Sequence, residues 1–330
     1  MFLSALISVF SIGAAPAAWS QAWTPPKGEG DISFTYFNLY TADHLTGDGH
    51  AFPAGKIRLT GVTQSIDYGI NDRLAFSFGL PYGFGKYVGA RPHALPIDNG
   101  LYHGTLQDFR LGMRYNLLAR PLVLTPYVTS TFPTHEYLHF AHSAIGADMW
   151  EVQLGVAVGK RLDRWIPNTY LQGSYSYGIQ EKVLNIRPNR SRFFLEMGHF
   201  VGKRFTLRGL LSAQVTHSGL DFPEDFKPPR DATNPIWYRH DQLGRIDYLY
   251  AGGGFDYALT PSLAIGANVL RTAWGENGHK LNLGLTTGIS WHFRMPWARP
   301  QLALVQNQSD TQQSIWRNQS ALLVPAGCHH

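Results

Sequence analysis

The chain has 330 residues, of which 44% are hydrophobic and only 15% are charged, and its formal net charge is +5. Ordinary soluble domains contain about 25% charged residues, so this balance argues against a cytosolic enzyme and favours an all-β membrane wall. The net charge is small and no dense basic run occurs, which argues against nucleic acid as a partner. The single cysteine, Cys328, excludes a disulfide within one chain and a cysteine-based zinc site.

Residues 1–22 predict a secretory signal peptide. Residues 2–15 are apolar and rich in alanine, and Ser20 and Ala22 supply the small residues that cleavage after Ala22 requires. No basic residue precedes the apolar run, so either the amino terminus alone supplies the charge or the true start lies upstream. An uncleaved anchor is the alternative, but the run is short and is broken by Pro16.

Alternation of apolar and small residues in 73–87 carries the fold prediction. Leu74, Phe76 and Phe78 alternate with small residues, which is the period of a strand with one apolar face. In 280–293 the same rule places Leu281 and Leu283 on one apolar face. The pattern predicts twelve strands, at about 31–40, 56–69, 73–87, 105–117, 121–132, 148–161, 168–180, 191–201, 205–218, 244–258, 262–273 and 280–293.

The connections between these strands alternate in length. Tight turns are expected near 71–73, 118–121, 163–165, 202–204 and 259–262, and longer loops at 41–55, 88–104, 133–147, 181–190, 219–243 and 275–279. This is the organisation of a transmembrane barrel, which must close because lipid offers an open sheet edge no hydrogen-bond partner. We predict an all-β fold, a transmembrane antiparallel up-and-down β-barrel. The alternative is a soluble sandwich or lipocalin-like barrel, which would bury the apolar faces in a core.

The barrel is expected to occupy residues 23–293. Residues 23–30 are too short to form a plug, and residues 294–330 are expected to be a poorly ordered periplasmic tail. The lipid bilayer and lipopolysaccharide would then be its surroundings, and the oligomeric state stays open, with a monomer as a plausible state.

Polar residues at inward positions are the candidates for a solute path. A polar constriction would select solutes, whereas a salt-bridged interior would seal the barrel. Twelve strands lie between eight-stranded barrels, which side chains fill, and open porins with 16–18 strands, so a narrow and partly plugged channel is expected. The predicted lumen-lining residues are Asp108, Arg110, Arg114, Glu151, Gln153, Glu196, Arg208 and Gln214.

Neither a metal site nor a catalytic site is predicted. His135, His139 and His142, with Glu136, could be zinc ligands, but their spacing suits a helix and they lie in an expected loop. Outer-membrane phospholipases carry a His and a Ser two residues apart, and no His-X-Ser occurs here. His217 and Ser218 are adjacent, so on a strand they point to opposite faces and cannot pair. We therefore expect no cofactor.

Four segments suggest a family: WTPPKGEGDISFTYF, YGINDRLAFSFGLPY, DFRLGMRYNLL and LTPYVTSTFPTHEY. Together they resemble the outer-membrane β-barrel family named for the meta pathway of phenol degradation, over about residues 23–293. The resemblance implies an outer-membrane location and uptake of small, often aromatic or apolar, compounds, and it supplies no catalytic residues. The extension after the last strand departs from the usual ending of that family.

The function predicted is a passive outer-membrane channel for small molecules. Two alternatives stay open. One is a sealed barrel that acts through its external loops, in adhesion or envelope structure, and the other is a lipid-active enzyme.

Overall fold

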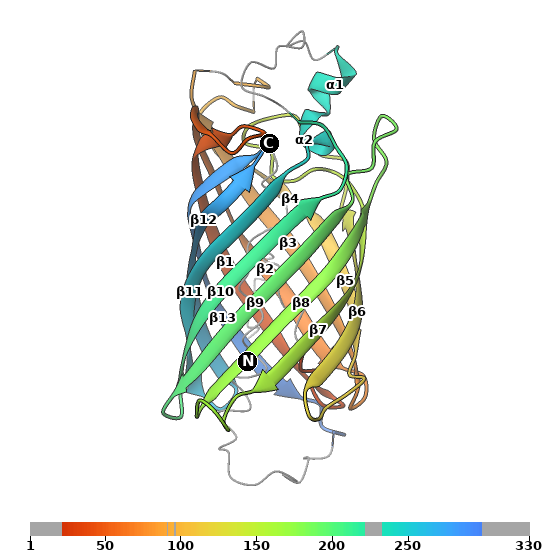
Figure 1. Cartoon of the computed structure of the whole chain (residues 1–330), viewed down its shortest axis with the longest axis vertical. Helices are drawn as coiled ribbons and strands as arrows, with labels where there is room; N and C mark the ends of the chain where they lie inside the picture. Colours follow the sequence, from red (N-terminus) through yellow and green to blue (C-terminus); the bar gives the residue numbers. More distant parts are fainter. Residues whose placement is uncertain (1–21, 91, 96, 222–232, 299–330) are drawn as a thin grey trace, which may run out of the picture.

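The chain forms a tall closed barrel of tilted antiparallel strands (Figure 1). The computed structural model describes residues 22–90, 92–95, 97–221 and 233–298. The predicted signal peptide, apart from Ala22, and the predicted C-terminal tail beyond Ala298 lie outside the described residues. In the described part, no helix is long and apolar enough to cross a membrane.

Thirteen labelled strands and two short helices make up the described fold. The strands are β1 (Glu29–Leu45), β2 (Ala51–Gly69), β3 (Leu74–Val88), β4 (His103–Leu106), β5 (Asp108–Tyr115), β6 (Val123–Pro133), β7 (Glu151–Arg161), β8 (Thr169–Gln180), β9 (Arg190–Val201), β10 (Phe205–Thr216), β11 (Asp247–Thr260), β12 (Leu263–Glu276) and β13 (His279–Arg294). The helices, α1 (Pro235–Tyr238) and α2 (His240–Leu243), lie in the connection between β10 and β11.

The barrel has twelve strands because β4 and β5 are one strand interrupted at Gln107. Both pair with β3, and β1 pairs with β13 and β2, which leaves no open edge. Each sequential pair is antiparallel, so the twelve-stranded up-and-down prediction is confirmed.

The outer face of the barrel is apolar. Leu154, Leu195 and Val269, at 57%, 42% and 47% exposure, stand on three different strands, and Leu195 and Val269 each precede a buried residue, Glu196 and Leu270. A water-soluble protein rarely exposes so extended an apolar surface, and an apolar band around a closed barrel is the surface that lipid requires. The soluble alternative is therefore wrong: the Phe76 and Phe78 face lies on the outer wall and not in a core.

One apolar residue of the last strand was placed on the wrong face. Leu281 is buried inside the barrel at 5% exposure, whereas Leu283 is 48% exposed. The pairing of β1 with β13 shifts register between Tyr40 and Thr41, which leaves Asn282 as an extra residue. Such a bulge reverses the inward and outward alternation on either side of it.

The connections alternate in length, with two exceptions at the long-loop end. The β1–β2 and β12–β13 connections are short, at residues 46–50 and 277–278, because these strands continue past the predicted loops. The short turns lie at the opposite end, where the expected tight turns occur.

The start of the described chain lies inside the short-turn end of the barrel. Ala22 is fully buried, and its carbonyl oxygen accepts a hydrogen bond from the Thr125 hydroxyl. Trp23 packs edge-on against Tyr170 at 6.0 Å between ring centroids. Trp23 therefore packs against the inner wall at this end, while the expectation that residues 23–30 are too short to form a plug stays a prediction.

Candidate functional site: the barrel interior

Part of the interior is apolar. The inward residues of β1, β2, β10, β11, β12 and β13 form a continuous buried cluster (the apolar cluster): Phe37, Leu39, Leu59, Leu210, Tyr250, Leu270 and Leu281, with Ile145 from the β6–β7 connection. The predicted lumen residues are all polar, so this cluster was not predicted. In β1 both faces are apolar, since Phe34 and Tyr36 are exposed while Phe37 is buried, so alternation could not single out the inward set.

The β6–β7 connection folds into the barrel instead of projecting outward. We call residues 137–149 the inward segment; residues 139–146 within it are all buried. Ile145 reaches the apolar cluster. A Cβ atom on Gly83 or Gly85 would overlap the segment, at Ile145 and at the Ser143 carbonyl respectively. The small inward residues of β3 are therefore the surface on which this segment rests.

Polar contacts fix the inward segment at several points. The Tyr137 hydroxyl donates to Asp108, and Gln107 donates to the Ile145 carbonyl. Asp98, in the β3–β4 loop, accepts from the backbone N–H of Ser143 at 3.0 Å and from its hydroxyl at 2.7 Å. Burial alone would raise the pKa of Asp98, but the bonds from Ser143 and from backbone N–H groups outweigh it and lower that pKa. The segment is thus an anchored part of the interior.

Towards the short-turn end, Arg208 of the predicted set is held between two carboxylates. Its guanidinium contacts Asp256 at 2.9 Å and Glu196 at 3.5 Å, and all three side chains are at most 4% exposed. Glu196 also accepts hydrogen bonds from Tyr170 and, at 3.1 Å, from Gln172. Asp256 was not predicted, because strand 244–258 alternates poorly.

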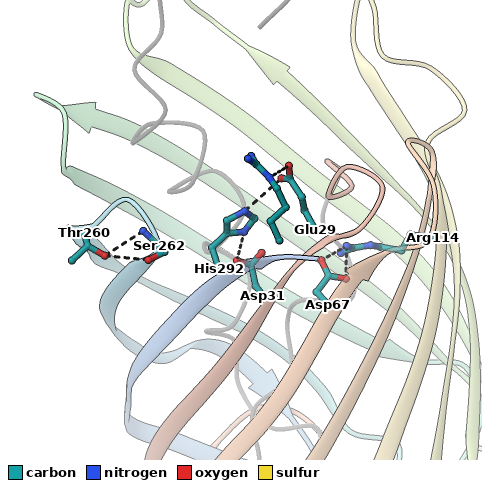
Figure 2. Close-up of polar contacts among 8 residues, drawn as sticks. Glu29, Asp31, Asp67, Arg114, Thr260, Ser262 and His292 are labelled. Atoms are coloured by element: carbon teal, nitrogen blue, oxygen red, sulfur yellow. Dashed lines mark hydrogen bonds and ion pairs between the residues drawn. The ribbon is translucent and has the colours of Figure 1, made fainter. Parts of the chain in front are cut away.

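The opposite wall at this end carries a second charged group, shown in Figure 2. Arg114 donates to both oxygens of Asp67, at 2.8 and 2.6 Å, and its side chain is fully buried. Nearby, His292 lies 3.1 Å from Asp31 and 3.5 Å from Glu29 (Figure 2). Arg114 was predicted at the lumen, but these carboxylates were not.

A third group connects Glu151, Gln153 and Gln214 of the predicted set through strands β7 to β10. Arg192 donates to both carboxylate oxygens of Glu151 and, at 3.1 Å, to Gln214. Gln153 accepts from Ser176 at 3.2 Å. Arg192, missed by the sequence analysis, is thus the centre of this group.

The remaining predicted residues, Asp108 and Arg110, lie further along β5. Asp108 is tied to Tyr137 of the inward segment. Arg110, four residues from Arg114 on the same strand, does not share its ion pair with Asp67. All eight predicted residues lie on inward positions, but they divide among separate groups instead of forming one ring.

The three histidines considered as zinc ligands do not converge. His135 is exposed and contacts Thr105 at 2.9 Å, and His139 packs against Tyr238. His142 instead meets His44 and His279, from the opposite ends of the described barrel sequence. No spacing within one segment could have indicated that meeting.

A serine and a histidine pair on the outer wall. Ser191 lies near the start of β9, and its Oγ is 2.7 Å from Nε2 of His217, the residue that follows β10. Both lie on the face of Phe193 and Val215, which are 47% and 40% exposed. The absence of a local His-X-Ser therefore did not exclude a contact across strands.

The folds of known proteins match this architecture, although no family model and no curated protein matches the chain. An outer-membrane channel from Pseudomonas putida F1 superposes with a TM-score of 0.64 at 17% identity, over 82% of this chain and 98% of that one. Weaker matches are the NalP autotransporter translocator domain from Neisseria meningitidis (TM-score 0.44, 13% identity, 81% of this chain and 90% of that one) and a mutant of TodX, a monoaromatic hydrocarbon channel (0.43, 9%, 82% and 91%). At these identities the likeness shows an outer-membrane type of barrel fold.

Proposed function

We propose that the protein is an outer-membrane channel of a Gram-negative bacterium through which small molecules with an apolar or aromatic part diffuse passively. The observation that carries the proposal is the mixed interior: the apolar cluster and several buried ion pairs share the inner surface of the barrel. The inward segment contacts both kinds of surface, through Ile145 and through Tyr137. The resemblance to the meta-pathway family agrees with this solute class. Export by the predicted signal peptide and contact with lipopolysaccharide belong to the same proposal.

The apolar cluster argues for the solute class. A purely structural polar interior would need no apolar patch. For an apolar solute, in contrast, moving from water onto such a surface is favourable by about 25 cal/mol for each Å² of apolar surface buried. The charged groups of the interior would hold water in the path and restrict larger polar solutes. Since Ile145 covers the cluster, the inward segment would control access to it.

Recording from the purified protein in planar bilayers, with swelling of protein-loaded liposomes in phenol or in a sugar, tests the proposal. We expect stepwise conductance and faster entry of phenol than of the sugar. Ile145→Ala should increase both rates because it uncovers the apolar cluster. Ile265→Ala, on the outer face at 37% exposure, is the matched control and should leave them unchanged. No conductance from wild type or from Ile145→Ala would reject the channel.

The sealed barrel is the first alternative, and one observation favours it. Arg208 with its carboxylates, Arg114 with Asp67, and the apolar cluster are all almost completely buried. If these contacts persist in the membrane, the barrel would transmit no solute and its external loops would carry the function. Silent bilayers together with a heat-resistant barrel would support that alternative.

The lipid-active enzyme is favoured by one contact, between Ser191 and His217. A serine nucleophile needs such a base, and the base in turn needs a group that orients it. Among the described residues, none hydrogen-bonds the other ring nitrogen of His217, so an orienting group is lacking. Labelling by a fluorophosphonate in wild type, lost in Ser191→Ala, would establish this activity; unlabelled protein would exclude Ser191 as a nucleophile of that kind.

A further inference from the structure

Three histidines from distant parts of the chain converge at the long-loop end of the barrel. His44 lies near the end of β1, His279 begins β13 opposite it in the strand ladder, and His142 comes from the inward segment. One ring nitrogen of each lies within 4.8 Å of the others. The His44 and His279 rings are 4.1 Å apart between centroids, with their Nε2 atoms in contact.

The surrounding contacts fix these rings in place. The His142 ring stacks on Tyr87 at 4.3 Å and on His93 at 3.6 Å between centroids. Its backbone N–H donates to Asp98 at 3.0 Å. His44 packs edge-on against Phe52 at 5.5 Å. Two rings are thus held by a strand ladder and the third by an anchored segment, which is the preorganisation that a ligand site needs.

The chemistry of this cluster (the histidine triad, His44, His142 and His279) selects a class of ligand. Neutral imidazoles suit zinc, copper and nickel, whereas magnesium and calcium prefer oxygen ligands. Tetrahedral zinc with Zn–N bonds of about 2.0–2.1 Å places its nitrogens about 3.3 Å apart. The nitrogens lie within 4.8 Å of one another, so a bound ion would require only small adjustments of the packed rings.

There is also room beside the triad for a further ligand. A small pocket between the inward segment and the β1–β2 wall is lined by His142 and His279, together with Leu39, Leu59 and Ala144. Its remaining lining is largely apolar, so the pocket offers the metal no competing carboxylate. We propose that the histidine triad binds one divalent transition-metal ion of the zinc class, with water as the fourth ligand.

A neighbouring group, His93, His240 and Asp241, is less suited to a metal. Both ring nitrogens of His240 already have partners: Nδ1 lies 2.6 Å from the Trp237 carbonyl, and Nε2 lies 2.8 Å from Asp241. Burial opposes the charged imidazole, but Asp241 outweighs it and raises the pKa of His240. That group is therefore an ion pair in α2, whereas the three imidazoles of the histidine triad match the ligand preference of zinc, copper and nickel.

Metal binding would fasten the inward segment to the barrel wall. His142 belongs to the segment, while His44 and His279 belong to strands that pair with each other. A bound ion would therefore add a cross-link of the segment to β1 and β13 in the folded state, which stabilises that state by mass action. This inference concerns binding and does not depend on whether a solute passes through the barrel.

Calorimetric titration of Zn²⁺ into the detergent-solubilised, tag-free protein tests the site. The terminal Cys328, His329 and His330 are themselves possible ligands, so the reference protein carries C328S, H329A and H330A. We expect one equivalent of Zn²⁺ bound, and affinity more than about tenfold weaker in His142→Ala and in His279→Ala. His50→Ala, whose side chain is 82% exposed, should bind as the reference does.

Three further measurements keep the test decisive. Heat-dependent gel mobility reports whether each variant still forms the barrel, and His142→Ala alters a connection instead of the strand ladder. Co²⁺ in the reference protein should give the intense visible absorption of a four-coordinate site, and Zn²⁺ should abolish it. Zn²⁺ should also raise the heat-unfolding midpoint of the reference protein but not of His142→Ala. Failure of the reference protein to bind either ion, or equal binding by the folded His142→Ala variant, would overturn the proposal.

Discussion

Arg208 illustrates what a single residue contributes to the interior. Its guanidinium holds Glu196 and Asp256 together at 3.5 and 2.9 Å, and none of the three is more than 4% exposed at its side chain. Two buried carboxylates without their cation would be uncompensated. Arg208→Met should therefore lower the free energy of unfolding by about 3–5 kcal/mol, the range for breaking a buried ion pair from one side. Urea unfolding in lipid vesicles measures the change.

The matched control for that substitution is Arg204→Met, in the exposed turn between β9 and β10. It removes the same charge with little loss of packing, so its effect should be within about 0.5 kcal/mol. If Arg208→Met proved as mild as Arg204→Met, the three charges would be hydrated in the membrane, and a water-filled lumen at this end would replace the packed one.

The charged residues of the interior were predictable from the sequence only in part. Alternation placed Arg114, Glu151 and Arg208 on inward positions, because each follows an apolar residue in the period-two pattern, and all three are buried. It could not predict their partners: Asp67 and Arg114 are 47 residues apart, on β2 and β5, which both pair with β3, and the register of these pairings decides which residues meet. Partners separated in this way become visible only with the three-dimensional register.

At the scale of elements, the inward segment depends on the small inner face of β3. A Cβ on Gly85 would overlap the Ser143 carbonyl, and a backbone carbonyl cannot move aside as a flexible side chain can. Gly85→Val should therefore displace the segment while leaving the barrel closed. Limited proteolysis of intact vesicles should show faster cleavage within residues 137–149, and bilayer conductance should rise.

Gly209→Val provides the control, since a Cβ there would meet no atom within 4 Å. It introduces the same side chain on the outward face of β10 and should change neither cleavage nor conductance. Slow cleavage in Gly85→Val would mean that β3, and not the segment, adjusts to the new side chain. The inward course of this segment was not predictable, because residues 133–147 have a loop composition and their burial is decided by Gly83 and Gly85 on another strand.

The ends of some strands, and the facing of one residue, were also not predictable from the sequence. Two predicted loops, 41–55 and 275–279, are shorter than expected because β1 continues to Leu45 and β13 begins at His279. At these strand ends polar and apolar residues no longer alternate, although the backbone hydrogen bonds between the strands continue. Leu281 was misplaced because a one-residue bulge changes facing without changing composition. The number and direction of the strands were predictable because they depend on many repeats of the alternating pattern. Which side chains point inward near a bulge depends on a single residue and was not predictable.

For the whole molecule, the central prediction is that lipid surrounds the barrel. Leu211 stands midway along β10 and Val201 ends β9, and they are similarly exposed, at 41% and 47%. In water, arginine at either position would have a similar and small effect. In a bilayer the penalty depends on depth, at about 2–4 kcal/mol at the midplane and about 0–1 kcal/mol near the interface. Leu211→Arg should therefore destabilise the vesicle-embedded protein far more than Val201→Arg, as measured by reversible denaturant unfolding.

Transfer of both variants into a thinner bilayer should reduce the difference, because the Leu211 position then lies closer to the headgroups. Equal free-energy changes in the thicker bilayer would contradict a membrane-spanning β10 and would leave the apolar outer face to be covered by another protein.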